Sequence, residues 1–356
     1  MKSIAFALSY VLETLFRVLP VPCRPGLIKI GHPNRHSPVF LTGNFHLTVQ
    51  KVKRSLTGLD AYLLVANSHG INVWCGSAGG HFTNHDVISS LKTSGIEDLV
   101  DQRTVIMPQL AAAGLEAKII KDRTGWHVIW GPVYAKDIPS FLNNGLKKDP
   151  AMREVRFPWP YRLEMAVAWA FPISLVFLLF LIFLWPSGII PAVGLIWGLS
   201  LILFLAFPVY GPLLSSKGRR IGFIFFDFGR GGLQLIILTV LLVCLFAYSF
   251  FLRSFSWDFF LHWGILLFMI VLVLSIDLKG STPLFKSSLH EERLYRVFID
   301  RVKCRGAGAC QDVCPRNCYL IDKKENKVKM PGASRCVACG ACIIQCPHDA
   351  LRFKGP

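Results

Sequence analysis

Two hydrophobic patterns divide this chain. From about residue 37 to residue 150, short apolar runs alternate with amphipathic stretches, and from 165 to 278 long apolar stretches follow one another. Short apolar runs bounded by turn residues predict β-strands. The five predicted strands are Val39–Thr42, Ala61–Ala66, Ile71–Cys75, Thr104–Met107 and His127–Val133.

Two amphipathic stretches between these runs predict helices. Residues 84–93 have Thr83 and Asp86 at the spacing of a capping box, and Gly95 marks the end of this helix. Residues 136–144 form the second helix, which ends at the glycine that follows. Strands that alternate with helices predict a Rossmann-like α/β domain with a mostly parallel sheet, whose ligands bind beyond the carboxyl ends of the strands.

The long apolar stretches predict four transmembrane helices. Each has a core free of Asp, Glu, Lys and Arg, and a helix of ~20 residues spans the ~30 Å hydrocarbon core of a bilayer. Buried helices of a large soluble core are the alternative, but such a core does not require four such runs in succession. The predicted helices occupy about 165–185, 188–208, 232–252 and 257–278.

The composition agrees with soluble parts joined by membrane spans. Hydrophobic residues make up 53% of the 356, and the mean hydropathy is +0.46. The formal charge of +17 comes without a long basic block or a stacking motif, so we expect no nucleic-acid partner. Basic residues instead flank the predicted spans, and the positive-inside rule places those flanks in the cytoplasm. The flanking residues are Arg153, Arg156, Arg162, Lys217, Arg219, Arg220, Arg230, Lys279, Lys286, Arg293 and Arg296.

Four spans bring both soluble parts to the same, cytoplasmic side of the membrane. The sequence therefore predicts a multi-pass protein of the inner (cytoplasmic) membrane, in contact with lipid. Glu13 and Arg17 interrupt the apolar start of the chain, and no small-residue cleavage site follows, so we expect an interfacial or packing helix there and no signal peptide. The predicted domains are an α/β domain at 1–160, a transmembrane domain at 161–280 and a ferredoxin domain at 281–356.

The cysteines of the tail indicate iron–sulfur chemistry. Eight of the eleven cysteines lie between positions 304 and 346, which in a reducing compartment indicates metal–sulfur ligation and not disulfides. The second motif, Cys336-x2-Cys339-x2-Cys342-x3-Cys346-Pro347, has the spacing of bacterial ferredoxins. In that pattern Cys336, Cys339 and Cys342 join Cys314 around one 4Fe–4S cluster; a zinc site is the alternative. The tail is thus predicted to be an α+β two-cluster ferredoxin that receives electrons from a donor.

The first motif of the tail is incomplete, because Ala307 stands where a second cysteine is expected. Either this cluster is a three-iron type, or Cys318 supplies a fourth thiolate, and the sequence leaves both open. A buried structural thiol is a further interpretation of Cys318. The remaining predicted ligands of the first cluster are Cys304, Cys310 and Cys346.

One further cysteine, Cys75, follows an apolar run and precedes a glycine-rich turn. A single cytoplasmic cysteine in such a place is usually a small buried hydrophobic residue. The glycines after it do not have the Gly-x-Gly-x-x-Gly order of dinucleotide-binding loops. We expect His69, His81 and His85 to be solvated, and Cys23 and Cys244 to be structural.

Several segments together resemble the membrane corrinoid protein of bacterial and archaeal mercury methylation. The corrinoid domain of that family is similar to that of the corrinoid iron–sulfur protein of the acetyl-CoA pathway, and the tail here resembles the family's separate ferredoxin partner. The resemblance covers nearly the whole sequence, and Asn-Val-Trp-Cys is its most specific element. The segments are Asn72-Val73-Trp74-Cys75, Pro108-Gln109-Leu110, Gly131-Pro132, Tyr134–Pro139 and Gly211–Arg220.

The resemblance implies that Cys75 is the catalytic residue and the lower axial ligand of a corrinoid cobalt. A thiolate is a soft, donating ligand, which favours transfer of a methyl group on the opposite side to an acceptor such as mercury(II). The methyl donor is a cytoplasmic protein or small molecule, and the ferredoxin part returns the cobalt to its reduced state. Glycines next to the motif let a flat macrocycle approach the backbone. The implied corrinoid-binding residues are Asn72, Val73, Trp74, Cys75, Gly76, Gly79 and Gly80.

The chain also departs from this family. Gly76 follows the motif where the family has alanine, the family's lysine after the motif is missing, and no cysteine pair ends the tail. Two alternatives therefore stand beside mercury methylation. One is corrinoid-dependent methyl transfer to another acceptor, and the other is a membrane-anchored ferredoxin that passes electrons to a quinone or a partner complex.

Overall fold

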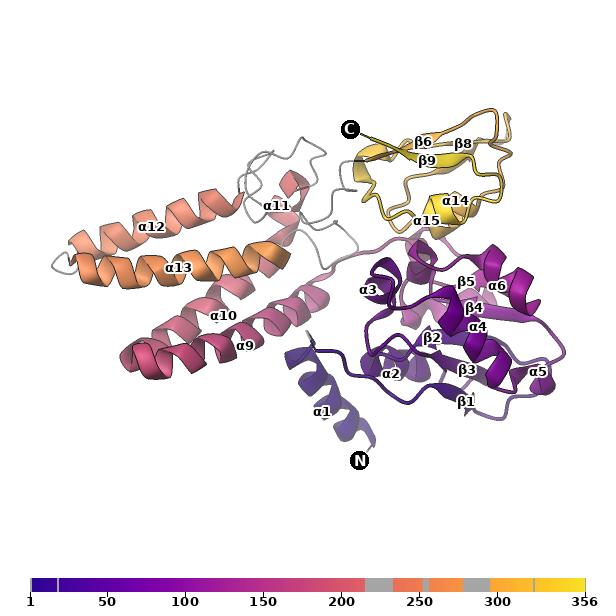
Figure 1. Cartoon of the computed structure of the whole chain (residues 1–356), viewed down its shortest axis with the longest axis horizontal. Helices are drawn as coiled ribbons and strands as arrows, with labels where there is room; N and C mark the ends of the chain where they lie inside the picture. The colour runs from indigo at the N-terminus through magenta and orange to yellow at the C-terminus, as the bar shows by residue number, and fades with distance from the viewer. Residues whose placement is uncertain are drawn as a thin grey trace. The chain divides into compact units, whose positions relative to one another are not determined.

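The computed structural model describes residues 2–17, 19–214, 233–251, 256–277, 295–322 and 324–355. The chain forms two compact units (Figure 1). The α/β–ferredoxin unit comprises Leu19–Arg156 and Tyr295–Gly355. The helical unit comprises Met1–Val18, Phe157–Leu294 and Pro356. The ferredoxin part therefore shares a compact unit with the α/β part, although the apolar helices lie between them in the sequence.

A five-stranded sheet forms the centre of the α/β part, in the order β1-β3-β2-β4-β5. Four strands are parallel, and β1 pairs antiparallel with β3 at one edge. The predicted mostly parallel sheet is confirmed, while β1 has no clear pattern in the sequence because it is a partly exposed edge strand. The strands are β1 (Gly26–Ile30), β2 (Val39–Gly43), β3 (Ala61–Ala66), β4 (Thr104–Met107) and β5 (His127–Trp130).

The helix predicted at 84–93 is confirmed as α4, which begins at Asn84 after a capping box formed by Thr83 and Asp86. The second predicted helix is divided into a short 3-10 turn and a helix that ends at Asn143. The helical elements of this part are α2 (His46–Ser55), α3 (Val73–Ala78), α4 (Asn84–Thr93), α5 (Ile96–Leu99), η1 (Gln109–Ala113), α6 (Ala117–Thr124), η2 (Ala135–Asp137), α7 (Ile138–Asn143) and α8 (Pro150–Arg153).

The predicted strand Ile71–Cys75 is wrong, because helix α3 occupies most of this segment. Asn72 precedes the helix with an extended backbone, and its side-chain oxygen accepts a hydrogen bond from the Cys75 N–H at 3.0 Å. An asparagine in this position satisfies a backbone donor that a helix start would otherwise leave unpaired. A local cap therefore outweighs a short apolar run.

The sheet is buried on both faces. All six residues of β3 are buried, and they alternate between two hydrophobic clusters. Tyr62 and Leu64 belong to one cluster, while Leu63 and Val65 belong to the other, as expected for side chains that alternate across a strand. Burial on both faces explains why β3 has a continuous apolar sequence.

The ferredoxin part consists of two small antiparallel ladders and short helices next to the cysteines. Helices α14 and α15 begin after Gly308 and Gly340, whose φ angles are +80° and +81°. This left-handed conformation favours glycine, and both glycines are followed by Ala-Cys. The elements are β6 (Arg296–Ile299), α14 (Ala309–Val313), β7 (Leu320–Asp322), β8 (Lys327–Lys329), η5 (Ala333–Arg335), α15 (Ala341–Ile344) and β9 (Leu351–Lys354).

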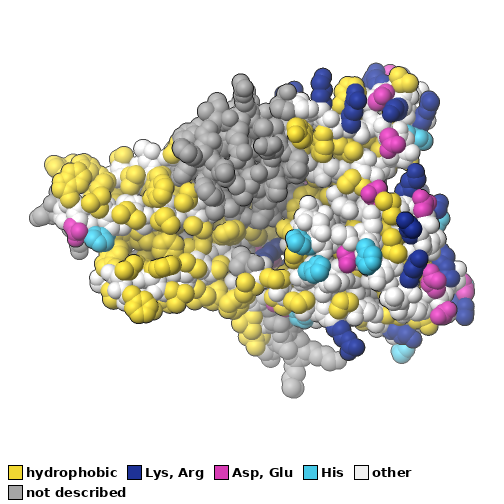
Figure 2. Space-filling view, viewed as in Figure 1, with side chains coloured by type: hydrophobic (Ala, Val, Ile, Leu, Met, Phe, Trp, Pro, Cys, Tyr) yellow, Lys and Arg dark blue, Asp and Glu magenta, His cyan; other side chains and the backbone are white. Residues whose placement is uncertain are grey.

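The helical unit contains three described helices that are long and apolar enough to cross a membrane: Trp159–Leu184, Pro186–Leu205 and Trp257–Leu274. The fourth predicted span is described as an apolar helix only over Leu233–Phe251, and its remaining residues lie outside the described ranges. Hydrophobic side chains cover most of the visible surface of these helices (Figure 2). The elements are α9 (Trp159–Leu184), η3 (Pro186–Gly188), α10 (Ile189–Leu205), α11 (Phe207–Leu214), α12 (Leu233–Phe251) and α13 (Trp257–Asp277).

Helix α1 (Lys2–Leu15) packs against α9 in the helical unit. Glu164 of α9 accepts hydrogen bonds from the Tyr10 hydroxyl and from Arg17, whose Nη1 lies 3.1 Å from Glu164 Oε2. Phe16 and Phe171 meet edge to face, with ring centroids 5.1 Å apart. The start of the described chain is therefore a packing helix, as its sequence predicts.

Candidate functional site

Helix α3 presents Cys75 on its open face. Val73, Gly76 and Ser77 are buried, whereas Trp74 and Cys75 are half-buried, and the helix ends in small, exposed residues from Ala78 onward. In a helix, residues three and four apart share one face. The buried residues therefore form the packed face of α3, and the Cys75 thiol lies on the opposite face.

A hydrogen-bonding centre at Asn44 fixes the loop that leads into α3. Asn44 follows β2 and is buried, and its Oδ1 accepts from the backbone N–H groups of Ser68 and Gly70 at 2.8 and 2.9 Å. Its amide also donates to the Cys23 carbonyl oxygen at 3.1 Å. Sequence reasoning missed this residue, although a polar side chain directly after a buried strand was the available signal.

Close backbone packing joins α3 to the segment η1. A Cβ atom at Gly114, directly after η1, would collide with the carbonyl oxygen of Ser77. Only glycine allows this approach without a movement of the backbone. The position of Cys75 is therefore tied to the position of η1.

The glycines of the predicted corrinoid-binding segment have different roles. Gly76 belongs to the packed face of α3, where an added Cβ would lie 3.2 Å from the Cβ of Phe82. Gly79 ends the helix and donates its N–H to the Cys75 carbonyl oxygen at 2.9 Å. Gly80 has a φ of +74° and open space around it. Only the last two glycines are thus on the exposed side that a cofactor would approach.

These residues fit a cofactor that approaches α3 from outside. The half-buried thiol of Cys75 is next to Trp74, an aromatic side chain, and to Ala78 and Gly79, which take little space. A soft metal such as cobalt accepts a thiolate ligand. Cys75 would hold the metal, and the small neighbours leave room for a flat ring.

The four cysteines predicted to ligate the 4Fe–4S cluster line one cavity, whose empty space of about 300 Å³ is partly open to solvent. They are Cys314, Cys336, Cys339 and Cys342, and they come from both halves of the ferredoxin part. Within the described residues, no three His, Cys, Asp or Glu side chains surround a single metal ion. The four thiols instead stand around a space, as the corners of a 4Fe–4S cube require. We call this space the second cavity.

Hydrogen bonds reach the sulfur atoms of the second cavity. The Tyr319 hydroxyl donates to Cys342 Sγ at 3.1 Å, and the Cys318 N–H donates to Cys314 Sγ at 3.3 Å. A hydrogen bond from the Cys318 thiol lowers the pKa of Cys314 to about 7, whereas burial raises the pKa of Cys342 well above its usual value. Such donors stabilise negative charge on a cluster and so raise its reduction potential.

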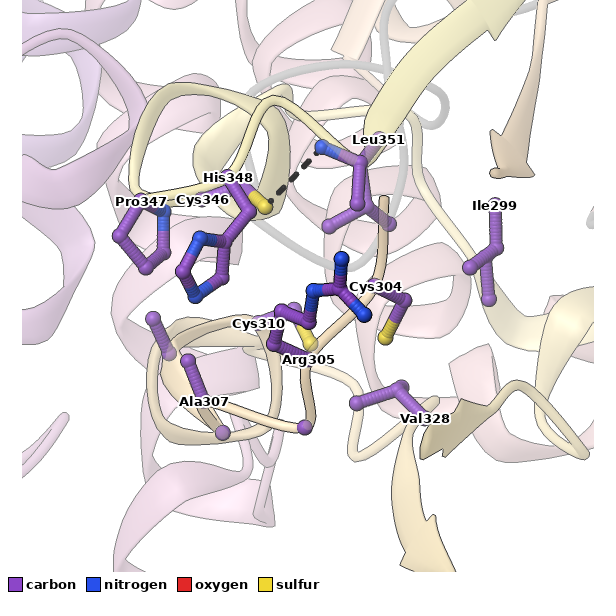
Figure 3. A pocket seen from close by; sticks show the side chains of 14 residues that line it. Ile299, Cys304, Arg305, Ala307, Cys310, Val328, Cys346, Pro347, His348 and Leu351 are labelled. Atoms are coloured by element: carbon purple, nitrogen blue, oxygen red, sulfur yellow. Dashed lines mark hydrogen bonds between the residues drawn. The ribbon is translucent and has the colours of Figure 1, made fainter. Parts of the chain in front are cut away.

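The first cavity is lined by Cys304, Cys310 and Cys346, and its empty space of about 350 Å³ is partly open to solvent (Figure 3). Ala307 is also in its wall, at the position where the motif lacks a cysteine. Burial raises the pKa of the Cys310 thiol to about 12, so this thiol is neutral at pH 7 until a metal displaces its proton. Cys318 is not among the residues that line this cavity; it is buried and lines the second one.

The ferredoxin part packs on the α/β part within their common unit. Val313 of α14 and Ala341 of α15 belong to the same buried cluster as the α/β core, and Cys339 packs against that cluster. Both helices contact η1, which also contacts α3. The segment η1 thus lies between the Cys75 helix and the helices of the iron–sulfur motifs.

Polar side chains complete this contact. The Gln345 amide donates to the carbonyl oxygens of Ala112 and Leu115 at 3.0 and 2.5 Å and accepts from the Ala117 N–H at 3.3 Å. Sequence reasoning missed Gln345, because no local pattern reports a contact between segments so distant in the chain.

Lys148 forms a second polar link between the two parts. Its side chain is 2% exposed, and its Nζ lies 3.2 Å from Asp312 Oδ1 and 3.0 Å from Gln109 Oε1. The Gln109 amide in turn donates to the Arg153 carbonyl oxygen. Burial lowers the pKa of Lys148 to about 8 against the attraction of Asp312. A buried charge of this kind is tolerated only with such partners.

Two family models match this chain. Residues 12–142 match the model described as CO dehydrogenase/acetyl-CoA synthase delta subunit, and residues 296–347 match a 4Fe-4S dicluster domain. The gamma subunit of the acetyl-CoA decarbonylase/synthase complex of Archaeoglobus fulgidus is 40% identical over 125 residues, which are 35% of this chain and 26% of that protein. The corrinoid/iron-sulfur protein large subunit of Moorella thermoacetica is 33% identical over 130 residues, which are 36% of this chain and 29% of that protein.

The chain therefore spans less than a third of the length of these relatives. It combines a domain similar to corrinoid iron–sulfur proteins with a 4Fe–4S dicluster domain and with three described helices suited to cross a membrane.

Proposed function

We propose that this protein is a membrane-bound corrinoid methyltransferase with its own iron–sulfur electron supply. The observation that carries the proposal is the contact of η1 with both α3 and the ferredoxin helices. It connects the thiol predicted to bind the metal of a corrinoid with the cavity predicted to hold a 4Fe–4S cluster. A bound corrinoid supplies the cobalt centre that takes up electrons and carries a methyl group.

Each part of the chain has one task in this proposal. Cys75 ligates the metal, and the small residues on the open face of α3 admit the ring. Asn44 and Gly114 hold α3 in place through the loop before it and the segment beside it. Gln345 and Lys148 keep the second cavity against η1, so electrons travel within one compact unit.

The apolar helices hold this unit at the cytoplasmic face of the inner membrane, in contact with lipid. A cytoplasmic protein or small molecule provides the methyl group, and a separate donor reduces the clusters. The acceptor we favour is mercury(II), on the basis of the Asn72–Cys75 motif and the membrane segments. The missing lysine after the Asn72–Cys75 motif makes another soft acceptor the second candidate.

The first experiment measures corrinoid binding by the full chain, purified anaerobically in detergent and loaded with a corrinoid. We expect corrinoid absorbance bands that change in Cys75→Ala, while the iron content stays the same. Cys23→Ala is the matched control, because Cys23 is also half-buried in the α/β part. Iron–sulfur absorbance without any corrinoid binding would refute the proposal and favour an electron-transfer protein.

The second experiment addresses the acceptor. Anaerobic cells that produce the full chain, and cells that produce Cys75→Ala, are supplied with mercury(II), and methylmercury is measured. We expect methylmercury only with the unchanged chain. Its absence, together with corrinoid binding in the first experiment, would reject mercury and leave methyl transfer to another acceptor.

A further inference from the structure

The two halves of the ferredoxin part follow the same backbone course. Gly306 and Ala338 have φ angles of +70° and +52°, and Gly308 and Gly340 have +80° and +81°. Gly308 follows Gly306 at the same spacing along the chain as Gly340 follows Ala338. A left-handed alanine is uncommon, so its agreement with Gly306 shows a shared local conformation and not a coincidence of composition.

This equivalence extends to the cysteines. Cys304, Cys310 and Cys314 of the first half correspond to Cys336, Cys342 and Cys346 of the second half. Ala307 corresponds to Cys339, and both are flanked by equivalent residues in the same conformation. The first half therefore retains the turn that would present a thiolate and lacks only the sulfur atom.

The same equivalence assigns Cys318 to a position that is not a ligand. Cys318 corresponds to Ala350, and each donates its backbone N–H at 3.3 Å to the sulfur of the motif cysteine four residues before it. Figure 3 shows this contact to Cys346 in the first cavity. Position 318 thus supplies a backbone donor, and its side chain lines the second cavity, together with the four cysteines that are predicted to ligate the cluster there.

The open corner of the first cavity faces water. Ala307 is exposed, while Cys304 and Cys310 are buried. Among the described residues that line this cavity, His348 is the non-cysteine side chain that is able to bind iron, and it is exposed. An iron atom at this corner would have solvent in place of a protein thiolate and would be lost readily.

We propose that the first cavity holds a three-iron, four-sulfide cluster on Cys304, Cys310 and Cys346, while the second cavity holds a four-iron cluster. The residues of the first cavity do not fit the second 4Fe–4S cluster that a dicluster domain implies. The inference depends on the ferredoxin part alone, so a failure to bind a corrinoid would not contradict it.

The test is electron paramagnetic resonance, with iron and sulfide analysis, on the full chain purified anaerobically in detergent without corrinoid. We expect a three-iron signal in the oxidised protein and a four-iron signal after reduction. In Ala307→Cys the three-iron signal is expected to disappear, with a gain of one iron per chain. Cys304→Ala is expected to remove the three-iron signal and to keep the four-iron signal, which also shows that the variant folds.

Two further variants test whether another side chain ligates the cluster of the first cavity. Cys318→Ala and His348→Ala are both expected to leave the iron content and the three-iron signal unchanged. Two four-iron clusters in the unchanged chain would overturn the proposal. So would a change in the cluster type of the first cavity when Cys318 or His348 is replaced.

Discussion

Ala307 and Cys339 occupy equivalent places in the two halves of the ferredoxin part, and the difference between them separates the two cavities. Around Cys339, the four predicted ligands and Cys318 line the second cavity, Cys318 and Tyr319 donate hydrogen bonds to its sulfur atoms, and Cys339 packs against the α/β core. Around Ala307, three cysteines line the first cavity, and Ala307 itself is exposed. One backbone thus supports two sites of different chemistry, because single side chains determine the ligands.

The largest expected effect comes from Cys339→Ala. Because the second cavity borders the α/β core, loss of its cluster is expected to reduce the rate of electron delivery to the Cys75 site to that of the cluster-free protein. Stopped-flow absorbance of the bound corrinoid measures this rate. Cys310→Ala, in the first cavity, is the comparison, and an equal loss of rate in both variants would contradict different roles for the two cavities.

Gln345→Ala tests the contact between the second cavity and η1. The substitution removes three hydrogen bonds to the backbone, and at about 1 kcal/mol each the loss in the free energy of unfolding is roughly 2–3 kcal/mol. Urea unfolding in detergent and hydrogen exchange at the Ala117 amide measure it. Lys329→Ala, which removes an exposed ion pair with Asp322, should cost far less, because solvent screens such a pair; equal costs would argue against the contact.

Lys148 makes the stability of this contact depend on pH. Its pKa of about 8 in the folded protein is below the usual value of 10.5, so above pH 8 the unfolded chain binds more protons than the folded one. The free energy of unfolding should therefore rise with pH between 8 and 10.5, by at most about 1.4 kcal/mol per unit. Urea unfolding of the unchanged chain and of Lys148→Met at pH 8 and 9.5 isolates this contribution. An identical pH dependence in both proteins would rule it out.

Tyr319→Phe is expected to have the smallest effect. It removes the hydroxyl donor to Cys342 Sγ. That donor stabilises the reduced cluster, which is the more negative of the two redox states. A difference of about 1 kcal/mol between the two redox states lowers the one-electron potential by roughly 40 mV. A redox titration followed by paramagnetic resonance measures the potential of the second cavity. Tyr295→Phe, next to Phe353, should leave it unchanged, and a shift of the same size there would indicate a general change in packing.

The sequence predicts the sheet well and the site in part. Strands β3 and β4 have the bounds predicted from their apolar runs, because strands buried on both faces have a continuous apolar sequence. The prediction fails at Ile71–Cys75, where the side chain of Asn72 caps a helix. A rule based on apolar periodicity does not include such a hydrogen bond.

Motif spacing identifies which cysteines belong together but leaves Cys318 undecided. Assigning the role of Cys318 requires its equivalence with Ala350 in the structure. The two residues differ in type, but each donates its backbone N–H to the sulfur of the cysteine four residues before it. Gln345 and Lys148 have no local signal at all, since their partners lie far away in the chain. Contacts between domains are therefore the part of the site that sequence reasoning recovers least.

Gly114 limits how this protein is able to diverge. Every other amino acid at this position would push α3 away from η1 and move the Cys75 thiol with it. If Cys75 holds a corrinoid as proposed, a change of acceptor must therefore arise on the outward side of α3, at positions such as Trp74 and Ala78. A designer who wishes to change the specificity should vary those two positions and leave the glycine untouched.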